Sequence, residues 1–95
     1  MTAALHPSWV LRHEIPVDDQ WHDVQLPGGI VHVATRKPHA VEVWTFHYDG
    51  DPDPQVRTLR VYGTGQPIAD DDIRYLGTAI VPGGALVWHL VERLS

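Results

Sequence analysis

Turn-forming residues divide this chain into short segments, and this punctuation limits its possible folds more than any other feature. Six turn segments each contain proline, most of them with glycine or aspartate: residues 16–19, 27–29, 36–38, 49–54, 63–67 and 82–84. The stretches between them are rich in valine, isoleucine, threonine and aromatic residues, which are typical of β-strands. We therefore predict strands at residues 9–15, 21–26, 30–36, 40–48, 56–62, 75–81 and 85–92.

Two of these segments are apolar on both faces of the predicted strand. In AVEVWTFHY, residues 40–48, alternation places Trp44, Phe46 and Tyr48 on one face and mainly valine on the other. Residues 85–92 follow a similar pattern. Both strands are therefore expected in the middle of a sheet or in an interface.

The number and spacing of the strands predict the fold class. Short strands at regular intervals imply a mainly β domain, an antiparallel sandwich or open barrel of about seven strands. No window has a sustained helical period, and at most one or two helical turns are expected, one of them at residues 69–73. A chain of 95 residues has room for a single hydrophobic core. We expect one domain over residues 1–95, with residues 1–8 as a flexible N-terminal segment.

Composition excludes several classes of function. The formal net charge of −5 argues against sequence-independent binding to DNA or RNA, which needs a basic surface. A small anionic ligand stays open, because two or three arginines can form a locally positive pocket. The absence of cysteine rules out disulfides, thiolate zinc sites and a cysteine nucleophile. The N-terminus lacks the regions of a signal peptide and no apolar stretch could cross a bilayer, so we expect a cytoplasmic protein.

The residues that usually carry catalysis are dispersed. The seven histidines occur singly, and no pair has the spacing of a zinc site. His32, His47 and His89 lie in the middle of predicted strands and could converge if those strands were aligned. The two serines, Ser8 and Ser95, lie near the chain ends, which is unfavourable for a serine triad. We therefore predict no metal site, no cofactor and no catalytic residues.

The segment RVYGTGQPI, residues 60–68, is the strongest candidate for a ligand contact. Gly63 and Gly65 permit positive φ and close approach to the backbone, and Thr64 adds a hydroxyl and an N–H. The segment lacks the third glycine of a dinucleotide-binding motif and the lysine of a phosphate-binding loop. Two interpretations stay open: a glycine bulge that ends a strand, or a loop whose amides face a ligand held by neighbouring arginines.

Several motifs, taken in order, resemble a known family. They are a tryptophan and EIPVDD within residues 9–19, then LPGG, VWTF, RVYGTGQPI, YLGT and VWHLVE. This order resembles a family of small phage proteins catalogued as a domain of unknown function. It is also similar to anti-CBASS sponges, phage proteins that bind cyclic dinucleotide immune signals such as cyclic GMP-AMP. The resemblance implies a β-rich protomer, a homo-oligomer such as a tetramer, action in the host cytoplasm, and binding without catalysis.

A site for a cyclic dinucleotide requires stacking rings, cations and polar groups that contact base edges. Under the resemblance the ligand-binding candidates are Trp9, Trp44, Arg57, Arg60, Tyr62, Thr64, Gly65, Gln66, Arg74, Tyr75, Trp88 and His89. Gln66 departs from the family, in which histidine often follows GTG, and glutamine cannot become cationic near neutral pH. Two other functions stay open: a structural or interaction protein that binds through its tryptophans, and a phosphodiesterase with a histidine-bound metal.

Overall fold

The computed structural model describes residues 8–48, 50, 53–69 and 72–94, which form seven β-strands. They are β1 (Ser8–Pro16), β2 (His22–Leu26), β3 (Gly29–Lys37), β4 (Ala40–Tyr48), β5 (Gln55–Gly63), β6 (Ile73–Ile80) and β7 (Val87–Arg93). Every predicted strand is present, although most of the ends are shifted by one or two residues. The N-terminal segment expected to be flexible lies outside the described residues, except for Ser8, which begins β1.

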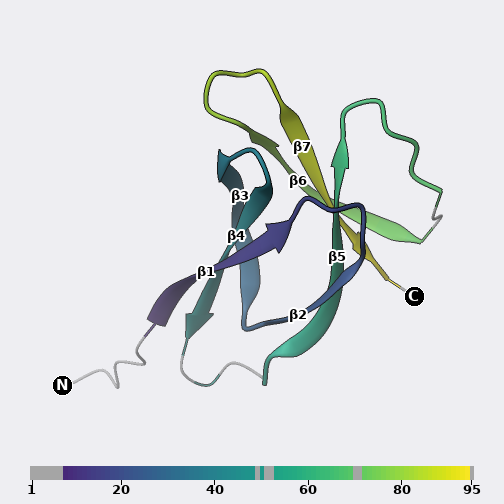
Figure 1. Ribbon diagram of the computed structural model, residues 1–95. Helices are drawn as coiled ribbons and strands as arrows, with labels where there is room; N and C mark the ends of the chain where they lie inside the picture. Colours follow the sequence, from purple (N-terminus) through teal and green to yellow (C-terminus); the bar gives the residue numbers. More distant parts are fainter. Residues whose placement is uncertain (1–7, 49, 51–52, 70–71, 95) are drawn as a thin grey trace.

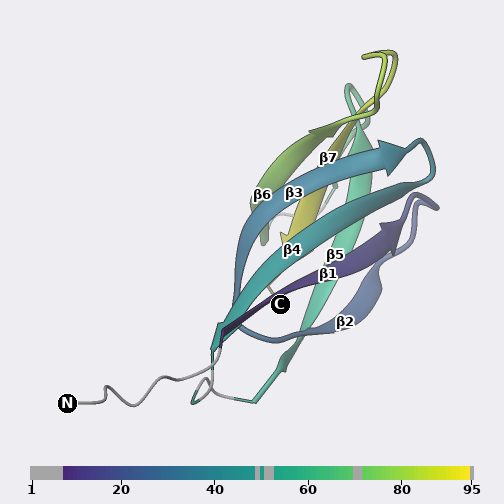
Figure 2. The same cartoon turned by 90° about the vertical axis from the view of Figure 1, so that its left-hand side faces the viewer.

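The strands form two antiparallel sheets that pack as a sandwich, which confirms the predicted mainly β fold. Sheet A has the order β1-β4-β3, and sheet B has the order β2-β5-β7-β6. Figure 1 shows sheet A on the left and most of sheet B on the right, and Figure 2 shows sheet A in front of β5, β6 and β7. β4 and β7, which the sequence predicts to be apolar on both faces, each lie between two neighbouring strands.

Helical structure does not occur among the described residues. Accordingly, that part of the chain contains no helix that is long and apolar enough to cross a membrane. The helical turn considered at residues 69–73 includes residues 70 and 71, which lie outside the described residues.

The hydrophobic core lies between the two sheets. Ile15, Val41 and Val43 point inward from sheet A and are fully buried, and Leu59 and Leu90 do the same from sheet B. Alternation produces this arrangement, because every second side chain of a strand points to the same face. Burial of each of these side chains contributes roughly 1.5–3 kcal/mol to folding. The alternate residues of β5 and β7 therefore point outward from sheet B.

A glycine and a register shift shape β6. A Cβ atom on Gly77 would lie 2.9 Å from Cγ2 of Val33 in β3, so glycine is needed for the two sheets to pack closely here. Between Tyr75 and Gly77 the register of β6 against β7 also shifts by one residue. Because of this shift, Tyr75 and Thr78 both point to the outer face of sheet B, although they lie three residues apart.

Candidate functional site

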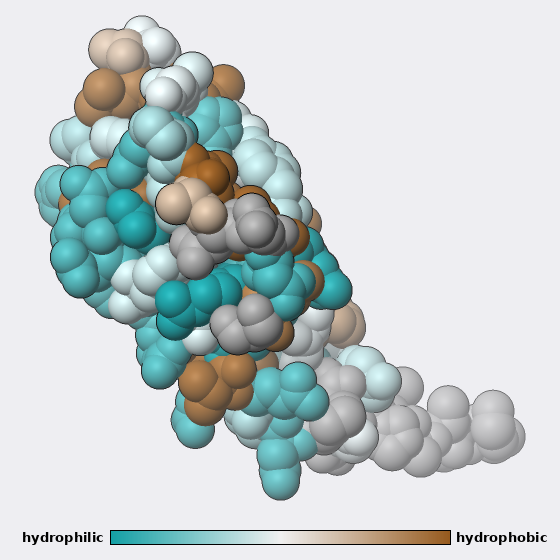
Figure 3. Space-filling view, turned by 90° about the vertical axis from the view of Figure 1, so that its right-hand side faces the viewer, coloured by the Kyte–Doolittle hydropathy of each residue, from teal (hydrophilic) through white to brown (hydrophobic). Residues whose placement is uncertain are grey.

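The outer face of sheet B brings together polar and aromatic residues from three strands. The register places Tyr62 of β5 and Thr78 of β6 on either side of His89 in β7. One row further along, Arg60 and Tyr75 lie on either side of β7. We define the outer-face cluster as Trp21, Arg60, Tyr62, Thr64, Tyr75, Thr78, His89 and Arg93. Figure 3, which views the side of the β5–β6 connection, shows a largely hydrophilic surface with small hydrophobic patches.

The GTG segment forms a tight turn at the end of β5. The Gln66 N–H donates to the Gly63 carbonyl over 3.1 Å, and Gly65 has a positive φ of 85°. A type II turn needs positive φ at its third residue, which favours glycine there. The other glycine makes room for a ring, because a Cβ atom on Gly63 would lie 3.3 Å from Trp88. The segment is therefore a turn that presents Thr64 to the outer-face cluster.

His89 is held by hydroxyl groups at both of its ring nitrogens. Its Nε2 lies 2.8 Å from Thr64 Oγ1, and its Nδ1 lies 2.8 Å from the Tyr75 hydroxyl. The Tyr75 and Thr78 hydroxyls are also hydrogen bonded to each other. A hydroxyl can donate or accept, so this arrangement satisfies either neutral tautomer of the imidazole. Tyr75 is still 55% exposed, so its ring is accessible to a ligand.

Two arginines lie against one tryptophan in the same cluster. The guanidinium carbon of Arg60 lies 6.0 Å from the Trp21 ring centroid, and that of Arg93 lies 4.9 Å from it. Arg60 also lies 4.5 Å from the Tyr62 ring centroid, and all three are cation–π distances. Tyr62 is only 2% exposed, so its ring supports Arg60 and is not accessible for stacking on a ligand.

Arg60 and Arg93 differ from the other four arginines of the chain in their ion pairing. The other four lie between 2.7 and 3.9 Å from one of two buried glutamates, Glu42 and Glu92. Arg60 lies 4.0 Å from Asp19, and its buried Nε has no hydrogen-bond partner within the described residues. Arg93 has no ion pair within the described residues. The arginine charges of the outer-face cluster are therefore the least compensated in the described part of the chain.

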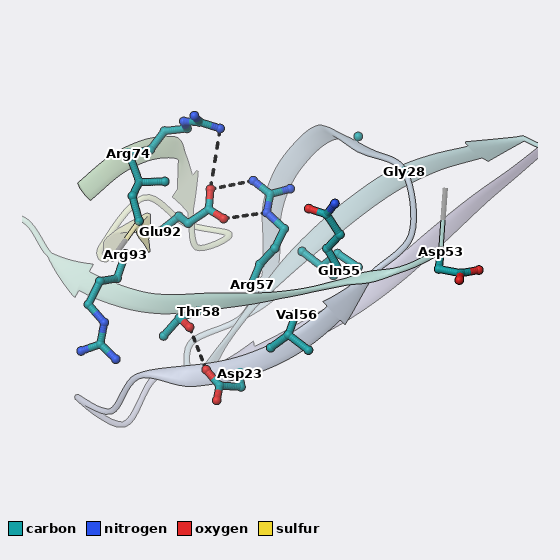
Figure 4. Close-up of a pocket in the computed structure, with 13 residues that line it drawn as sticks. Asp23, Gly28, Asp53, Gln55, Val56, Arg57, Thr58, Arg74, Glu92 and Arg93 are labelled. Atoms are coloured by element: carbon teal, nitrogen blue, oxygen red, sulfur yellow. Dashed lines mark hydrogen bonds and ion pairs between the residues drawn. The ribbon is translucent and has the colours of Figure 1, made fainter. Parts of the chain in front are cut away.

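A second group of charges lies in an open cleft of about 830 Å³ that is lined mainly by sheet B, with Gly29 at the start of β3. We call Arg57, Arg74 and Glu92 the mouth cluster. Arg57 donates two hydrogen bonds of 2.7 Å to Glu92, and Arg74 lies 3.9 Å from the same carboxylate. These hydrogen bonds lower the pKa of Glu92 and raise the pKa of Arg57. Figure 4 shows the three side chains together, with Arg93 pointing away from them.

All three predicted ligand-binding tryptophans lie outside the outer-face cluster. Trp9 stacks on His47 in sheet A with ring centroids 5.3 Å apart, and Trp44 belongs to β4 of the same sheet. Trp88 packs against the core, and its Nε1 donates to the Pro38 carbonyl over 3.1 Å. Gly65 and Gln66 lie in the turn beside the cluster. The Gln66 side chain accepts from the Gly63 N–H over 3.0 Å, so it stabilises the turn.

The mid-strand histidines do not converge. His32 and His47 lie on neighbouring strands of sheet A, opposite Trp44 and Trp9 respectively, whereas His89 lies in sheet B. No group of three or more histidine, aspartate or glutamate side chains among the described residues is placed to hold a metal ion.

Sequence patterns missed three members of the outer-face cluster: Trp21, Thr78 and Arg93. One signal could have found Trp21. Alternation along the predicted strand 21–26 places it on the same face as Asp23 and Gln25, and a tryptophan on a polar face suggests a contact role. No local pattern marks Thr78 or Arg93, because strand pairing brings them to the cluster.

Comparison with known proteins identifies one family. A family model described as a domain of unknown function (DUF7352) matches residues 8–95. No curated protein and no solved structure matches the chain. The family match covers all seven strands, and it agrees with the resemblance to proteins catalogued as a domain of unknown function.

Proposed function

Because the chain belongs to the DUF7352 family, whose description assigns no activity, we propose a function on the basis of its own residues. We propose that the protein is a phage-encoded sponge. It binds a cyclic dinucleotide immune signal, such as cyclic GMP-AMP, and sequesters it without cleaving it. Removal of the signal from the cytoplasm of the infected host evades the CBASS defence. The outer-face cluster is the proposed binding surface.

The observation that carries this proposal is the pair of guanidinium groups at Trp21. Arg60 and Arg93 approach one indole, and within the described residues neither donates a charge-assisted hydrogen bond to a carboxylate, since the nearest one to Arg60 is Asp19 at 4.0 Å. Two guanidinium groups with only one distant, exposed carboxylate near them favour an anionic ligand, although the net charge of the chain is −5. Two neighbouring guanidinium groups suit a ligand with two phosphates, because each can donate paired hydrogen bonds to phosphate oxygens.

The rest of the cluster supplies groups that suit the bases of such a ligand. The exposed ring of Tyr75 can stack on a base, a contact that tolerates any base identity. The Thr64 hydroxyl keeps a free acceptor lone pair for a base edge, while His89, whose two ring nitrogens are already hydrogen bonded, holds this hydroxyl in place. Their mutual hydrogen bond of 2.8 Å already fixes their positions, so ligand binding orders few side chains.

Isothermal titration of the purified protein with a panel of cyclic dinucleotides tests the proposal. We expect binding heat from at least one member of the panel. Chromatography of the ligand released by heating the protein is expected to show it intact. No heat from any member would contradict the proposed function, and a linear product would indicate catalysis instead of sequestration.

A matched pair of variants locates the site. Arg93→Gln and Arg74→Gln remove the same charge from neighbouring strands of sheet B, but only Arg93 lies at Trp21. Loss of a charge-assisted hydrogen bond costs about 1.5–3 kcal/mol, so R93Q is expected to weaken binding roughly 10- to 100-fold. R74Q is expected to retain the wild-type affinity. The reverse order of effects would place the ligand in the cleft of the mouth cluster.

A second function, as a structural or interaction protein, is favoured by apolar side chains exposed in sheet A. Trp9, Val10 and Phe46 are 43%, 59% and 43% exposed. Under this function the protein binds a virion component or inhibits a host protein. Co-purification with such a protein, together with the absence of nucleotide binding, would support this function over the sponge.

A further inference from the structure

β1 differs from the other three edge strands because its pairing is both long and uninterrupted. The edges of sheet A are β1 and β3, and the edges of sheet B are β2 and β6. β3 and β6 both contain register shifts, and β2 is only five residues long. β1 instead pairs with β4 through nine consecutive residues without a shift. Bulges and short strands prevent pairing between the edges of separate molecules, and β1 has neither protection.

The N-terminal half of β1 also exposes three consecutive apolar side chains. Trp9 is 43% exposed, Val10 is 59% exposed and Leu11 is 36% exposed. Phe46 lies opposite Val10 on β4 and is 43% exposed. Figure 1 shows this end of β1 on the left of the molecule, away from sheet B. An open edge and an apolar surface therefore coincide at the same half-strand, which is typical of an interaction site.

The order of these residues is complementary to itself. When two copies of β1 pair antiparallel with Val10 on the two-fold axis, Val10 lies opposite Val10 of the second copy, and Trp9 lies opposite Leu11. No other register pairs all three of these side chains with one another. On the outer face of sheet A, Val10 and Phe46 of both copies then form one continuous apolar row.

We propose that β1 pairs antiparallel with β1 of a second copy of this chain. The pairing joins two three-stranded sheets into one sheet that runs through the dimer. It would supply one interface of the homo-oligomer that the family resemblance implies. The proposal does not rest on the proposed function, because β1 belongs to sheet A and the outer-face cluster belongs to sheet B.

Charge substitutions at Val10 test both the pairing and its register. Val10→Lys places two like charges opposite each other across the two-fold axis, and Val10→Glu does the same. Each variant is expected to self-associate roughly tenfold more weakly or worse. A mixture of the two places lysine opposite glutamate and is expected to restore the dimer. Sedimentation velocity over a concentration series measures the molar mass.

Val31→Lys is the matched control, because Val31 is also 59% exposed but lies on β3. It is expected to keep the wild-type mass, and circular dichroism checks that every variant is folded. A wild-type protein that is monomeric at all concentrations overturns the proposal, as does a V10K variant with the wild-type mass. If the V10K and V10E variants dissociate but their mixture does not re-associate, the register centred on Val10 is wrong.

Discussion

Each sheet of the sandwich contains one buried glutamate between two arginines from the neighbouring strands. In sheet A, Glu42 on the central strand β4 lies between Arg12 of β1 and Arg36 of β3. In sheet B, Glu92 on β7 lies between an arginine of β5 and an arginine of β6. The two carboxylates have side chains only 1% and 8% exposed. The same residue types in the same strand order therefore occur twice.

The two sites differ in what surrounds the arginines. Glu42 points to the outside of sheet A, and the side chains of Arg12 and Arg36 are 40% and 68% exposed. Glu92 points into the cleft of the mouth cluster, where the Arg57 side chain is only 18% exposed. An unpaired charge costs most where water cannot reach it. Similar ion pairs are therefore expected to differ in their importance for stability.

The largest difference in stability between the two sites is expected when the buried carboxylate of each is removed. Glu92→Gln leaves Arg57 without a counter-ion in the cleft, and we expect the free energy of unfolding to fall by about 3 kcal/mol. Glu42→Gln is expected to lower it by about 1 kcal/mol, because its arginines can turn into solvent. Urea unfolding of both variants measures the two losses. Equal losses would mean that the exposure of the arginines does not determine the cost.

Within the mouth cluster, a smaller difference in the free energy of unfolding is expected between the lysine variants of Arg57 and Arg74. Arg57→Lys is expected to lower the free energy of unfolding by about 1–2 kcal/mol, because lysine cannot donate two parallel hydrogen bonds to Glu92. Arg74 lies 3.9 Å from Glu92 and its side chain is 61% exposed. Arg74→Lys is therefore expected to change stability by less than about 0.5 kcal/mol. Thermal or urea unfolding compares the two variants. A larger loss of stability in R74K than in R57K would mean that Arg74, and not Arg57, is the main partner of Glu92.

Acid is expected to remove the contribution of the Glu92 carboxylate to stability. Hydrogen bonds from Arg57 hold the pKa of Glu92 below its ordinary value. A depressed carboxyl pKa adds stability that is fully present above about pH 4.3 and is lost as the pH falls through the folded-state pKa. Stability of the wild-type protein is therefore expected to fall more steeply below about pH 4.3 than that of Glu92→Gln. Parallel slopes in unfolding curves measured at a series of pH values would contradict this.

The strand positions could be predicted because they depend on local patterns. The limits of β4 match the prediction at residues 40–48, where apolar side chains alternate without interruption. The start of β6 was predicted two residues late, at residue 75. Aspartates precede Ile73 and are typical of a solvated turn. Because of them, the local pattern indicates a turn up to the first residues of the strand.

The composition of the candidate site was only partly predictable. Arg57 and Arg60 lie three residues apart in one strand, so the two-residue period sends them to opposite faces of sheet B. Their closeness along the chain suggests a shared site, but the strand places them apart. Arg60 and His89 were both predicted, but the pairing of β5 with β7 that joins them follows from the whole fold. Trp21 and Arg93 meet for the same reason.

The strand order also determines when during synthesis the site can form. Sheet A is complete once residue 48 has been made, because its three strands all lie before that point. Sheet B takes its first strand from residues 22–26 and its last from residues 87–93, so β2 has no partner until β5 emerges. Glu92, His89 and Arg93 all arrive with the last strand. Before β7 is made, Arg57 lacks its carboxylate and the outer-face cluster lacks His89 and Arg93, so the growing chain can form its proposed binding surface only after β7 has emerged.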